Sequence, residues 1–523
     1  MFEKFAYDRN ATKRAKRLEA RPVATPRRKK WSAKTNLWDL LDNDTLTLVL
    51  SHCGERECVA LSGLDRRTNG MAKRALKQCM QLSESQWQTF RAVVERRESV
   101  FISGAPGTGK SHLLRVIRER MSRDTVWTAS TGAAAEKIEA RTLHSTFCIA
   151  FDDALNAKRT ASSCRRLRPD LVKMRTLVID EVSILKGWLL DYVLRVLETL
   201  LFHPGAVQFV LCGDPLQLGE VNESPSKPTP AGHPKGPSPF WTAELFERRK
   251  VRPYVLVENF RQGEGAEFTS ILNRARIGKA SLVDMKWLLA NARSSQGHGP
   301  TNQPWADQVR RAWAINASSA IPRPMCLFCH RQRVQEFNDG CMSARVMALG
   351  RVYYAVRSNG NTDHSLPGLS LKVGGRVMLT RNLREQPKLF NGSMGTIERL
   401  ETQWVGVHFD NGIRMRVKRV VWSTRDDVMH LPLEVGYAAT IHKAQGATLD
   451  SACVDLTGAF NPGHAYVALS RVREVGDMEI LGLDLRKLNH VNWEALRFYN
   501  RIKERSEAHI QALSEGEETR GVL

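Results

Sequence analysis

A glycine-rich stretch at Gly104–Ser111 constrains the fold of this chain of 523 residues more than any other part of its sequence. It has the pattern G-x-x-x-x-G-K-S, follows the apolar run Val100–Ile102 and precedes the amphipathic run His112–Ile117. A strand, a glycine-rich loop and a helix in this order place backbone N–H groups around the phosphates of a nucleotide. We therefore predict that Lys110 reaches the β- and γ-phosphates and that the Ser111 hydroxyl holds Mg²⁺.

The charge balance of the chain favours a polyanionic partner. The formal net charge is +23 at pH 7 and the pI is about 9.8. A protein that neutralises nucleic-acid phosphates releases their counterions, so an excess of lysine and arginine on this scale favours nucleic acid as the partner. The hydrophobic content of 42% is ordinary for globular domains, and the length predicts about three or four of them.

Several other classes of protein are not expected. No apolar run reaches the roughly 20 residues of a membrane-spanning helix, and no apolar core follows Met1–Lys4, so we expect neither a membrane segment nor a secretory signal. The cysteines form no dense framework, which indicates free thiols in a reducing compartment. Cys326–His330 has the C-x-x-C-H pattern of haem attachment, but it begins in a predicted buried strand, Met325–Phe328, and we exclude haem.

The N-terminal part of the chain differs in composition from the rest. Residues 1–37 are basic, with the densest cluster at Arg27–Lys30, and three interpretations stay open: a disordered tail, a nuclear localisation signal or an arm that binds DNA. Residues 38–80 predict a short helical module. Its apolar positions between Leu41 and Leu50 weakly resemble an F-box, although a generic helical hairpin would have a similar pattern.

From residue 81 onward the sequence predicts an α/β protein. Short apolar strands alternate with helical stretches over residues 81–250, which is the pattern of a parallel sheet with helical crossovers. A second α/β region is expected from about Val255. Between Leu371 and Val421 the pattern changes to alternating strands with hairpin signals such as Asn411-Gly412, which predicts a small β-barrel inserted into the second α/β region.

Polar residues follow predicted strands at the edge of the sheet that carries the glycine-rich loop. Asp180 and Glu181 end the apolar run Thr176–Ile179, and the carboxyl ends of parallel strands meet at one edge of a sheet. We predict that Asp180 holds Mg²⁺ and that Glu181 orients and deprotonates the attacking water. Gln217, after a further strand, is expected near the γ-phosphate, and Gln86, before the first strand, can pair with an adenine edge through its amide.

Hydrolysis also needs positive charge beside the oxygens of the transferred phosphate, which arginine side chains supply. Arg261 and Arg471 are the candidates, and both lie beyond the first α/β region. Two such arginines in a second α/β domain predict a nucleotide bound between two domains, whose closure depends on the γ-phosphate.

Taken in order along the chain, these motifs resemble those of superfamily 1B helicases, most closely the Pif-one (petite integration frequency) family, which is related to RecD-like enzymes. The resemblance covers about Leu82 to Leu483, and it departs from the family pattern after Leu218, where Gly219-Glu220 stand in place of the usual prolines. The segments that carry it are Gly104–Ser111, Thr128–Ala135, Thr142–Phe147, Asp180-Glu181, Gly213–Leu218, Phe260–Gln262, Gly436–Gly446 and Tyr466–Arg471.

The resemblance implies an enzyme that uses ATP and Mg²⁺ to move along single-stranded DNA in the 5′-to-3′ direction and to unwind duplexes. It also implies an α/β fold of two RecA-like P-loop domains, with a small wedge insertion at the basic segment after Phe147 and an inserted SH3-like β-barrel. The expected parts are a basic tail at 1–37, a short helical module at 38–80, a first RecA-like domain at 81–250, a second one at 251–370 and 426–500, an SH3-like insertion at 371–425, and a tail at 501–523.

The family pattern further implies roles for individual residues. Those expected at the nucleotide are Gln86, Gly104, Ala105, Pro106, Gly107, Thr108, Gly109, Lys110, Ser111, Gln445 and Gly446. Those expected in catalysis are Lys110, Glu181, Gln217, Arg261 and Arg471, and those expected on DNA are Thr131, His144, Thr440, His442 and Lys443. Hydroxyl, imidazole and ammonium groups can hold phosphates without reading bases, although packing is the alternative for both histidines.

The expected partners are single-stranded and forked DNA, bound by a monomeric motor that acts in replication, repair, recombination or telomere maintenance. The basic tail favours the nucleus, with the mitochondrion as the alternative. Two other functions stay open at this point. One is an adaptor in which residues 38–80 recruit a ubiquitin-ligase scaffold, and the other is a motor that acts on RNA, because an RNA motor would share every ATP residue.

Overall fold

A computed structural model describes residues 80–521, except for 150–155, 220–237, 259, 261–264, 294–324, 346–347, 358, 365–366, 384–385, 387–388, 390 and 424–427. The basic tail predicted at 1–37, and all of the helical module at 38–80 except Met80, lie outside the described residues. Residues 82–523 form one compact unit.

The first α/β domain is built on a parallel sheet with the strand order β3-β2-β4-β5-β1-β6. The strands are β1 (Val100–Gly104), β2 (Thr125–Ala129), β3 (Arg141–Thr142), β4 (Thr176–Asp180), β5 (Gln208–Cys212) and β6 (Arg252–Leu256). Every residue of β1, β4 and β5 is buried, as the apolar runs of these strands predict for the centre of a parallel sheet.

Helices connect these strands, and their apolar faces complete the first core. They are α5 (Glu84–Val94), α6 (Lys110–Arg120), α7 (Gly132–Lys137), α8 (Leu143–Thr146), α9 (Ala157–Leu167), α10 (Gly187–Leu200) and α11 (Leu245–Arg248). The basic segment Cys164–Arg168 forms the last turn and the C-cap of helix α9. The sequence does not indicate this helix clearly, because only Ala161 and Cys164 along it are buried. These two side chains belong to the same hydrophobic core as residues of α10.

The second α/β domain has its own parallel sheet, in the order β19-β7-β20-β21. Its strands are β7 (Met325–Phe328), β19 (Ala438–Thr440), β20 (Ala452–Asp455) and β21 (Met478–Leu481), and its helices are α12 (Gly265–Arg276), α13 (Leu282–Asn291), α15 (Arg331–Ser343), α16 (His464–Leu469) and α17 (Leu485–Leu488). The predicted buried strand at Met325–Phe328 is confirmed, with Cys326 fully buried, and the described cysteines are free thiols.

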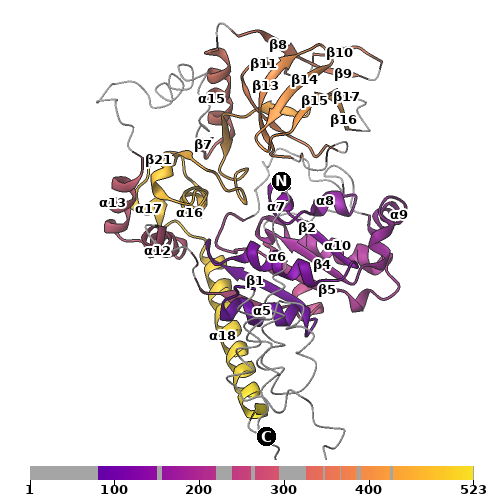
Figure 1. Cartoon of the computed structure of the whole chain (residues 1–523), viewed down its shortest axis with the longest axis vertical. Helices are drawn as coiled ribbons and strands as arrows, with labels where there is room; N and C mark the ends of the chain where they lie inside the picture. The colour runs from indigo at the N-terminus through magenta and orange to yellow at the C-terminus, as the bar shows by residue number, and fades with distance from the viewer. Residues whose placement is uncertain are drawn as a thin grey trace, which may run out of the picture. The chain divides into compact units, whose positions relative to one another are not determined.

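An antiparallel β region is inserted between β7 and β19, and it is longer than the predicted 371–425. Its main sheet has the order β15-β14-β13-β12-β18, and Figure 1 shows these strands in orange above the two parallel sheets. The strands are β8 (Gly350–Tyr353), β9 (Ala355–Arg357), β10 (Thr362–Asp363), β11 (Leu369–Lys372), β12 (Arg376–Leu379), β13 (Met394–Leu400), β14 (Trp404–Phe409), β15 (Arg414–Lys418), β16 (Val420–Ser423), β17 (Val428–His430) and β18 (Leu433–Val435).

Two other predicted boundaries are also wrong. Strand β6, which contains Val255, is not the start of the second domain, because it pairs in parallel with β1 in the first sheet. The segment 501–523 was expected to be a tail, but residues up to Gly521 belong to helix α18 (Trp493–Gly521), which packs on β6. The Val255 N–H donates to the Ser506 hydroxyl at 2.9 Å. Figure 1 shows this helix in yellow beside the first sheet.

None of the described helices is long and apolar enough to cross a membrane.

Replacing Phe498 should show that α18 belongs to the first core. Its ring stacks on Trp241 at 5.1 Å and meets Phe240 edge-on at 5.9 Å. Phe498→Ala removes a buried aromatic side chain, so we expect a loss of about 3–5 kcal/mol in the free energy of unfolding, measured by urea denaturation. Trp493→Ala is the matched control, because Trp493 on the same helix is 64% exposed and should change stability little. Equal losses for the two variants would contradict this packing.

Candidate nucleotide-binding site

The glycine-rich loop joins β1 to α6, as predicted, and its geometry requires glycine. The backbone of Gly107 has a φ of +89° and that of Gly109 a φ of +75°, a left-handed conformation that L side chains rarely adopt. A Cβ atom at Gly109 would also collide with the amide of Gln86. The loop therefore presents its backbone at the start of α6, where N–H groups can receive phosphates.

Lys110 and Ser111 begin helix α6 at the mouth of this loop. The Lys110 ammonium donates to the Gly104 carbonyl at 2.7 Å and to the Ala105 carbonyl at 3.1 Å, so its charge lies within the loop. Ser111 is exposed, in the first turn of the helix. Both side chains are therefore placed where the sequence predicts a phosphate and a metal ion.

Gln86 is fully buried and stabilises the glycine-rich loop through a hydrogen bond from helix α5. Its Oε1 accepts the Ser83 N–H at 3.1 Å in the capping box of α5, and its Nε2 donates to the Thr108 carbonyl at 3.0 Å. The amide thus joins the N-terminus of α5 to the phosphate-binding loop. The contact of Gln86 with an adenine edge stays a prediction.

Asp180 and Glu181 lie together at the carboxyl end of β4. Asp180 is only 6% exposed, and its Oδ1 accepts the Glu181 N–H at 2.8 Å. Burial, and then the charge of Glu181, raise the pKa of Asp180 to about 7. The Glu181 Oε2 is buried and has no hydrogen-bond partner among the described residues. Two adjacent carboxyl groups, one of them buried, are a good fit for a divalent cation, which oxygen ligands of this kind bind.

Gln217 follows β5 at the same edge of the sheet, together with Asp214. Gln217 is 8% exposed, and its Oε1 has no hydrogen-bond partner among the described residues. Its backbone N–H donates to the Asp214 carbonyl at 3.1 Å, so the position of Gln217 depends on that of Asp214. The amide thus lies at the edge of the sheet that carries the glycine-rich loop, and its contact with a γ-phosphate stays a prediction.

Asp214 joins the first domain to the second through a buried ion pair. Its carboxylate accepts hydrogen bonds from the Arg276 guanidinium at 2.6 and 3.0 Å and from the Tyr466 hydroxyl at 2.8 Å. Asp214 is fully buried and Arg276 is 4% exposed. Burial alone would raise the pKa of Asp214, but the charge and hydrogen bonds of Arg276 outweigh it and hold the pKa below the ordinary value.

The loop after β19 lies against the acidic pair of the first domain. A Cβ atom built on Gly446 would lie 3.7 Å from the Glu181 Oε1 and 3.7 Å from the Thr131 hydroxyl. The Gln445 Nε2 donates to the Leu218 carbonyl at 3.2 Å. Gln445 and Gly446, predicted at the nucleotide, are therefore brought beside the predicted catalytic carboxylate.

Lys137 is part of this contact, and sequence reasoning missed it. Its ammonium donates to the Gly446 carbonyl and, at 3.1 Å, to the Thr448 hydroxyl. It also lies within electrostatic range of Glu181 and Arg471. Its place at the end of the Thr131-capped helix α7 was the only available signal, and a lysine in the last turn of a helix is usually explained by the helix dipole.

Of the two predicted catalytic arginines, only Arg471 lies among the described residues, and its role at the nucleotide stays a prediction. Arg471 is 5% exposed, and its guanidinium donates to the carbonyls of Val467 at 2.8 Å and Ala447 at 3.1 Å and to the Ser470 hydroxyl at 2.7 Å. It therefore shapes the second-domain side of the contact. Arg261 lies outside the described residues, although the adjacent Phe260 donates its N–H to the Gly107 carbonyl at 3.2 Å.

The residues predicted on DNA come from both domains. Thr131 caps α7 by accepting the Ala134 N–H, and Thr440 accepts the Lys443 N–H in the same way. The Lys443 ammonium is paired with Glu434. Burial lowers the pKa of His144, in helix α8, to about 4. Burial, with the nearby Arg331, also lowers the pKa of His442, so both imidazoles are neutral at pH 7.

An aromatic cluster beside His442 was also missed. His442 meets His464 edge-on at 5.0 Å, His464 meets Phe460 edge-on at 4.9 Å, and Phe460 stacks on His330 at 4.9 Å. Phe460 is 53% exposed. The four side chains come from three separate segments of the chain, so no sequence pattern links them.

These features define the class: a P-loop protein of two parallel α/β domains, with an inserted β region, whose second domain reaches Glu181, the predicted hydrolytic carboxylate of the first. Residues 81–285 match the family model of PIF1-like helicases, and this region of the chain belongs to that family, as the motif resemblance predicts.

The curated relatives extend the similarity beyond this region. The ATP-dependent DNA helicase PIF7 of Trypanosoma brucei brucei is 31% identical over 83% of this chain and 49% of its own length. Human ATP-dependent DNA helicase PIF1 is 30% identical over 77% of this chain and 61% of its own length. The chain thus spans about half to three fifths of the length of these relatives.

Solved structures show the same fold. A Pif1 helicase from the study of DNA unwinding at forked duplexes by two coordinating Pif1 helicases has a TM-score of 0.65 and 26% identity, and the match covers 81% of this chain and 97% of that one. Bacteroides Pif1 bound to ADP-AlF3 and single-stranded DNA has a TM-score of 0.63 and 25% identity, over 81% and 97% of the two chains. The predicted α/β class is thereby confirmed.

The ion pair of Asp214 should contribute to the acid sensitivity of the fold. Asp214→Ala leaves a buried guanidinium without its counter-charge, so we expect a loss of about 3–5 kcal/mol in the free energy of unfolding at pH 7. The folded carboxyl has a pKa below its ordinary value of 3.8. The stabilisation is therefore present above that value and is lost as the pH falls through the lower folded value.

Denaturant unfolding at a series of pH values measures this effect. The difference between wild type and Asp214→Ala should shrink below about pH 4. The double variant Asp214→Leu/Arg276→Met is the matched control, because it removes both charges and should lose much less stability. A double variant as unstable as Asp214→Ala would contradict the account.

Proposed function

We propose that this protein is an ATP-dependent DNA helicase that moves 5′-to-3′ on single-stranded DNA. The observation that carries the proposal is the contact of the loop after β19 with the first domain. One end of this loop, Gly446, lies beside Glu181, the predicted hydrolytic carboxylate. The other end holds Thr440 and His442, the predicted contacts to DNA. A structural change at the γ-phosphate would therefore need to be transmitted through only a few residues to reach the bound DNA strand.

ATP is the proposed nucleotide substrate. Lys110 and the backbone of the loop would hold the β- and γ-phosphates, and Glu181 would orient and deprotonate the attacking water. Gln217 would contact the γ-phosphate and transmit its presence to Asp214, whose carbonyl accepts the Gln217 N–H. The curated relatives are named as ATP-dependent DNA helicases, which supports the same activity here.

Mg²⁺ is the proposed metal, held by Ser111 and Asp180. The exposed hydroxyl in the first turn of α6 and the buried carboxyl at the end of β4 fit a hard cation that prefers oxygen ligands. When bound, the ion would neutralise charge that develops on the phosphate oxygens. The role of the protein is to supply these two oxygens at the correct edge of the sheet.

The finer proposals concern partners and place. We propose that the motor acts as a monomer on forked DNA, in replication, repair, recombination or telomere maintenance. The basic cluster Arg27–Lys30 supports a nuclear location, which a reporter fusion of residues 1–37 would test. Recruitment of a ubiquitin-ligase scaffold by residues 38–80 has no further support, since that segment lies outside the described residues.

Lys110→Ala should abolish ATP hydrolysis. The variant loses the positive charge that meets the β- and γ-phosphates, so we expect ATPase activity to fall at least about 100-fold while the fold stays intact. Wild-type activity should need Mg²⁺ and rise sharply with oligo(dT).

Strand displacement from tailed duplexes tests the direction. A duplex with only a 5′ tail should be unwound, and one with only a 3′ tail should not. Preference for the 3′ tail, or no stimulation of wild-type ATPase by oligo(dT), would refute the proposed function.

The two kinds of predicted DNA contact should differ in salt dependence. Lys443→Gln removes a charge from the track, so the slope of log K against log salt should become shallower by about 0.7 on single-stranded DNA. His144→Gln should weaken binding without changing the slope, because the pKa of about 4 keeps His144 neutral at pH 7. Fluorescence anisotropy of labelled oligo(dT) between about 50 and 200 mM salt measures both. Equal slopes for wild type and Lys443→Gln would argue against a phosphate contact.

A further inference from the structure

A large hollow lies at the amino-terminal edge of the first sheet, away from the nucleotide site. It has a volume of about 840 Å³. Its lining includes residues that precede or begin strands of that sheet, such as Ser99 before β1, Arg175 before β4 and Arg252 in β6. The glycine-rich loop and Asp180 lie at the carboxyl ends of the same parallel strands. Strand β1 has 5 residues, so roughly 16 Å of sheet separates the two sites.

The hollow carries an excess of positive charge that the described residues do not neutralise. Its acidic groups, Glu98 and Asp124, are already engaged: Glu98 pairs with Arg252 at 3.2 Å and Asp124 faces Arg175 at 3.9 Å. The remaining cations of the lining are Arg97, Lys173, Arg249 and Lys250.

None of these remaining cations forms an ion pair with a carboxylate among the described residues, and Arg249 lies within electrostatic range of one, Glu198. Arg97, Lys173 and Lys250 are exposed and form no ion pair within the described part of the chain. The Arg249 Nε is buried, and among the described residues it has no hydrogen-bond partner. A cluster of this kind attracts anions, because bringing in negative charge removes the mutual repulsion of the cations.

Two of these cations stand where the backbone favours glycine. Arg97 has a φ of +55° and Lys250 a φ of +46°, both in the left-handed region. Each follows the end of a helix, α5 and α11 respectively, where glycine is the common residue. A residue with a long side chain strains the backbone in this conformation, and folding alone would favour glycine there. The presence of such a residue at both rims of the hollow therefore indicates that its positive charge has a function.

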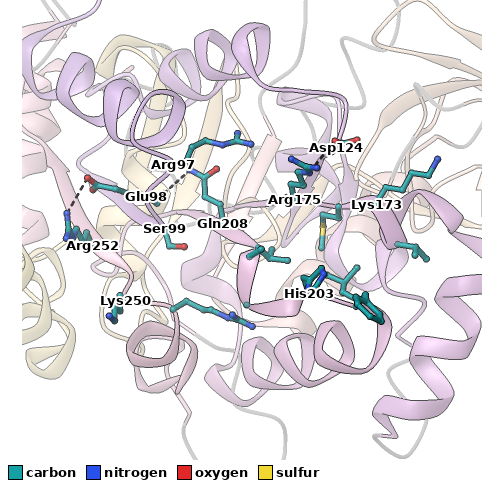
Figure 2. Close-up of a pocket in the computed structure, with 18 residues that line it drawn as sticks. Arg97, Glu98, Ser99, Asp124, Lys173, Arg175, His203, Gln208, Lys250 and Arg252 are labelled. Carbon is teal, nitrogen blue, oxygen red and sulfur yellow. Dashed lines mark hydrogen bonds and ion pairs between the residues drawn. The ribbon is translucent and has the colours of Figure 1, made fainter.

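The hollow also has an apolar wall. Phe202 is 93% exposed and Val172 is 45% exposed, and both line the hollow together with the buried Leu201. Figure 2 shows Lys250 and Arg252 toward one end of the hollow and Lys173 toward the other. An occupant therefore meets cations at both ends and apolar surface from Val172 and Phe202.

We propose that this hollow is a docking site for an acidic peptide segment of a partner protein, anchored by a large apolar side chain. Carboxylates of the peptide would pair with Arg97, Lys173 and Lys250, and its apolar side chain would pack on Val172 and Phe202. A peptide is favoured over nucleic acid for two reasons. The aliphatic wall of Val172 and Leu201 suits a side chain, and the residues predicted on DNA, such as Thr131, lie after the carboxyl ends of the strands.

The double variant Arg97→Gly/Lys250→Gly provides a clean test on the full-length chain. It removes two of the unpaired charges and relieves two left-handed positions, so its melting temperature should equal or exceed that of wild type. The matched control is Lys286→Gln/Arg505→Gln, which removes the same net charge from exposed positions that do not line the hollow.

The probe is a fluorescein-labelled peptide in which Leu-Phe is flanked on each side by alternating Asp and Glu. We expect wild type and the charge control to bind it equally, with an affinity that falls as salt increases. The double glycine variant should bind at least about fivefold more weakly, which corresponds to about 1 kcal/mol. A second peptide, with Ala-Ala in place of Leu-Phe, should bind wild type at least about tenfold more weakly than the first.

Three results would overturn the proposal. The first is that wild type does not bind the Leu-Phe peptide at about 1 mM, and the second is that wild type and the double glycine variant bind it with equal affinity. The third is that oligo(dT) displaces the peptide from wild type and that the double glycine variant also loses affinity for oligo(dT). The last result would assign the hollow to nucleic acid. The ATPase stimulated by oligo(dT) should stay within about twofold of wild type in the double glycine variant, so the outcome is independent of the proposed helicase activity.

Discussion

The buried ion pair between Asp214 and Arg276 is the interaction on which the rest of the site depends. Asp214 follows β5 in the first sheet, whereas Arg276 ends α12 in the second domain, and Tyr466 of α16 donates to the same carboxylate at 2.8 Å. Charges buried this deeply are tolerated only when they are paired, so the two domains are held together at the nucleotide edge. The Arg276 guanidinium also lies 4.1 Å from the Tyr499 ring of α18.

This arrangement explains how separate segments form one site. Residues that could bind and hydrolyse a nucleotide lie in the first domain, and the loop after β19 reaches them from the second. Lys137 holds that loop through the Gly446 carbonyl, beside Glu181. The opposite edge of the same sheet carries a hollow with unpaired cations. The first domain therefore presents two chemically distinct edges, because all of its strands run in the same direction.

Local patterns in the sequence were enough wherever the signal came from neighbouring residues. The glycine-rich loop, the buried strand at Met325–Phe328 and the acidic pair after β4 follow from residues that are close in sequence and that shape their own backbone. The boundary at Val255 and the tail at 501–523 were wrong for the opposite reason. A strand pattern does not say which sheet the strand joins, and a helix pattern does not say which domain it covers.

The sequence by itself thus determined the class of fold, the nucleotide-binding loop and the residues at the carboxyl ends of the strands. Only the tertiary structure decided that Asp214 pairs with Arg276, that Lys137 meets Gly446, and that Arg471 is held by carbonyls of its own domain. These contacts join residues that are far apart in the chain. Their partners are chosen by how the two domains pack, and no local pattern of charge or hydrophobicity records that choice.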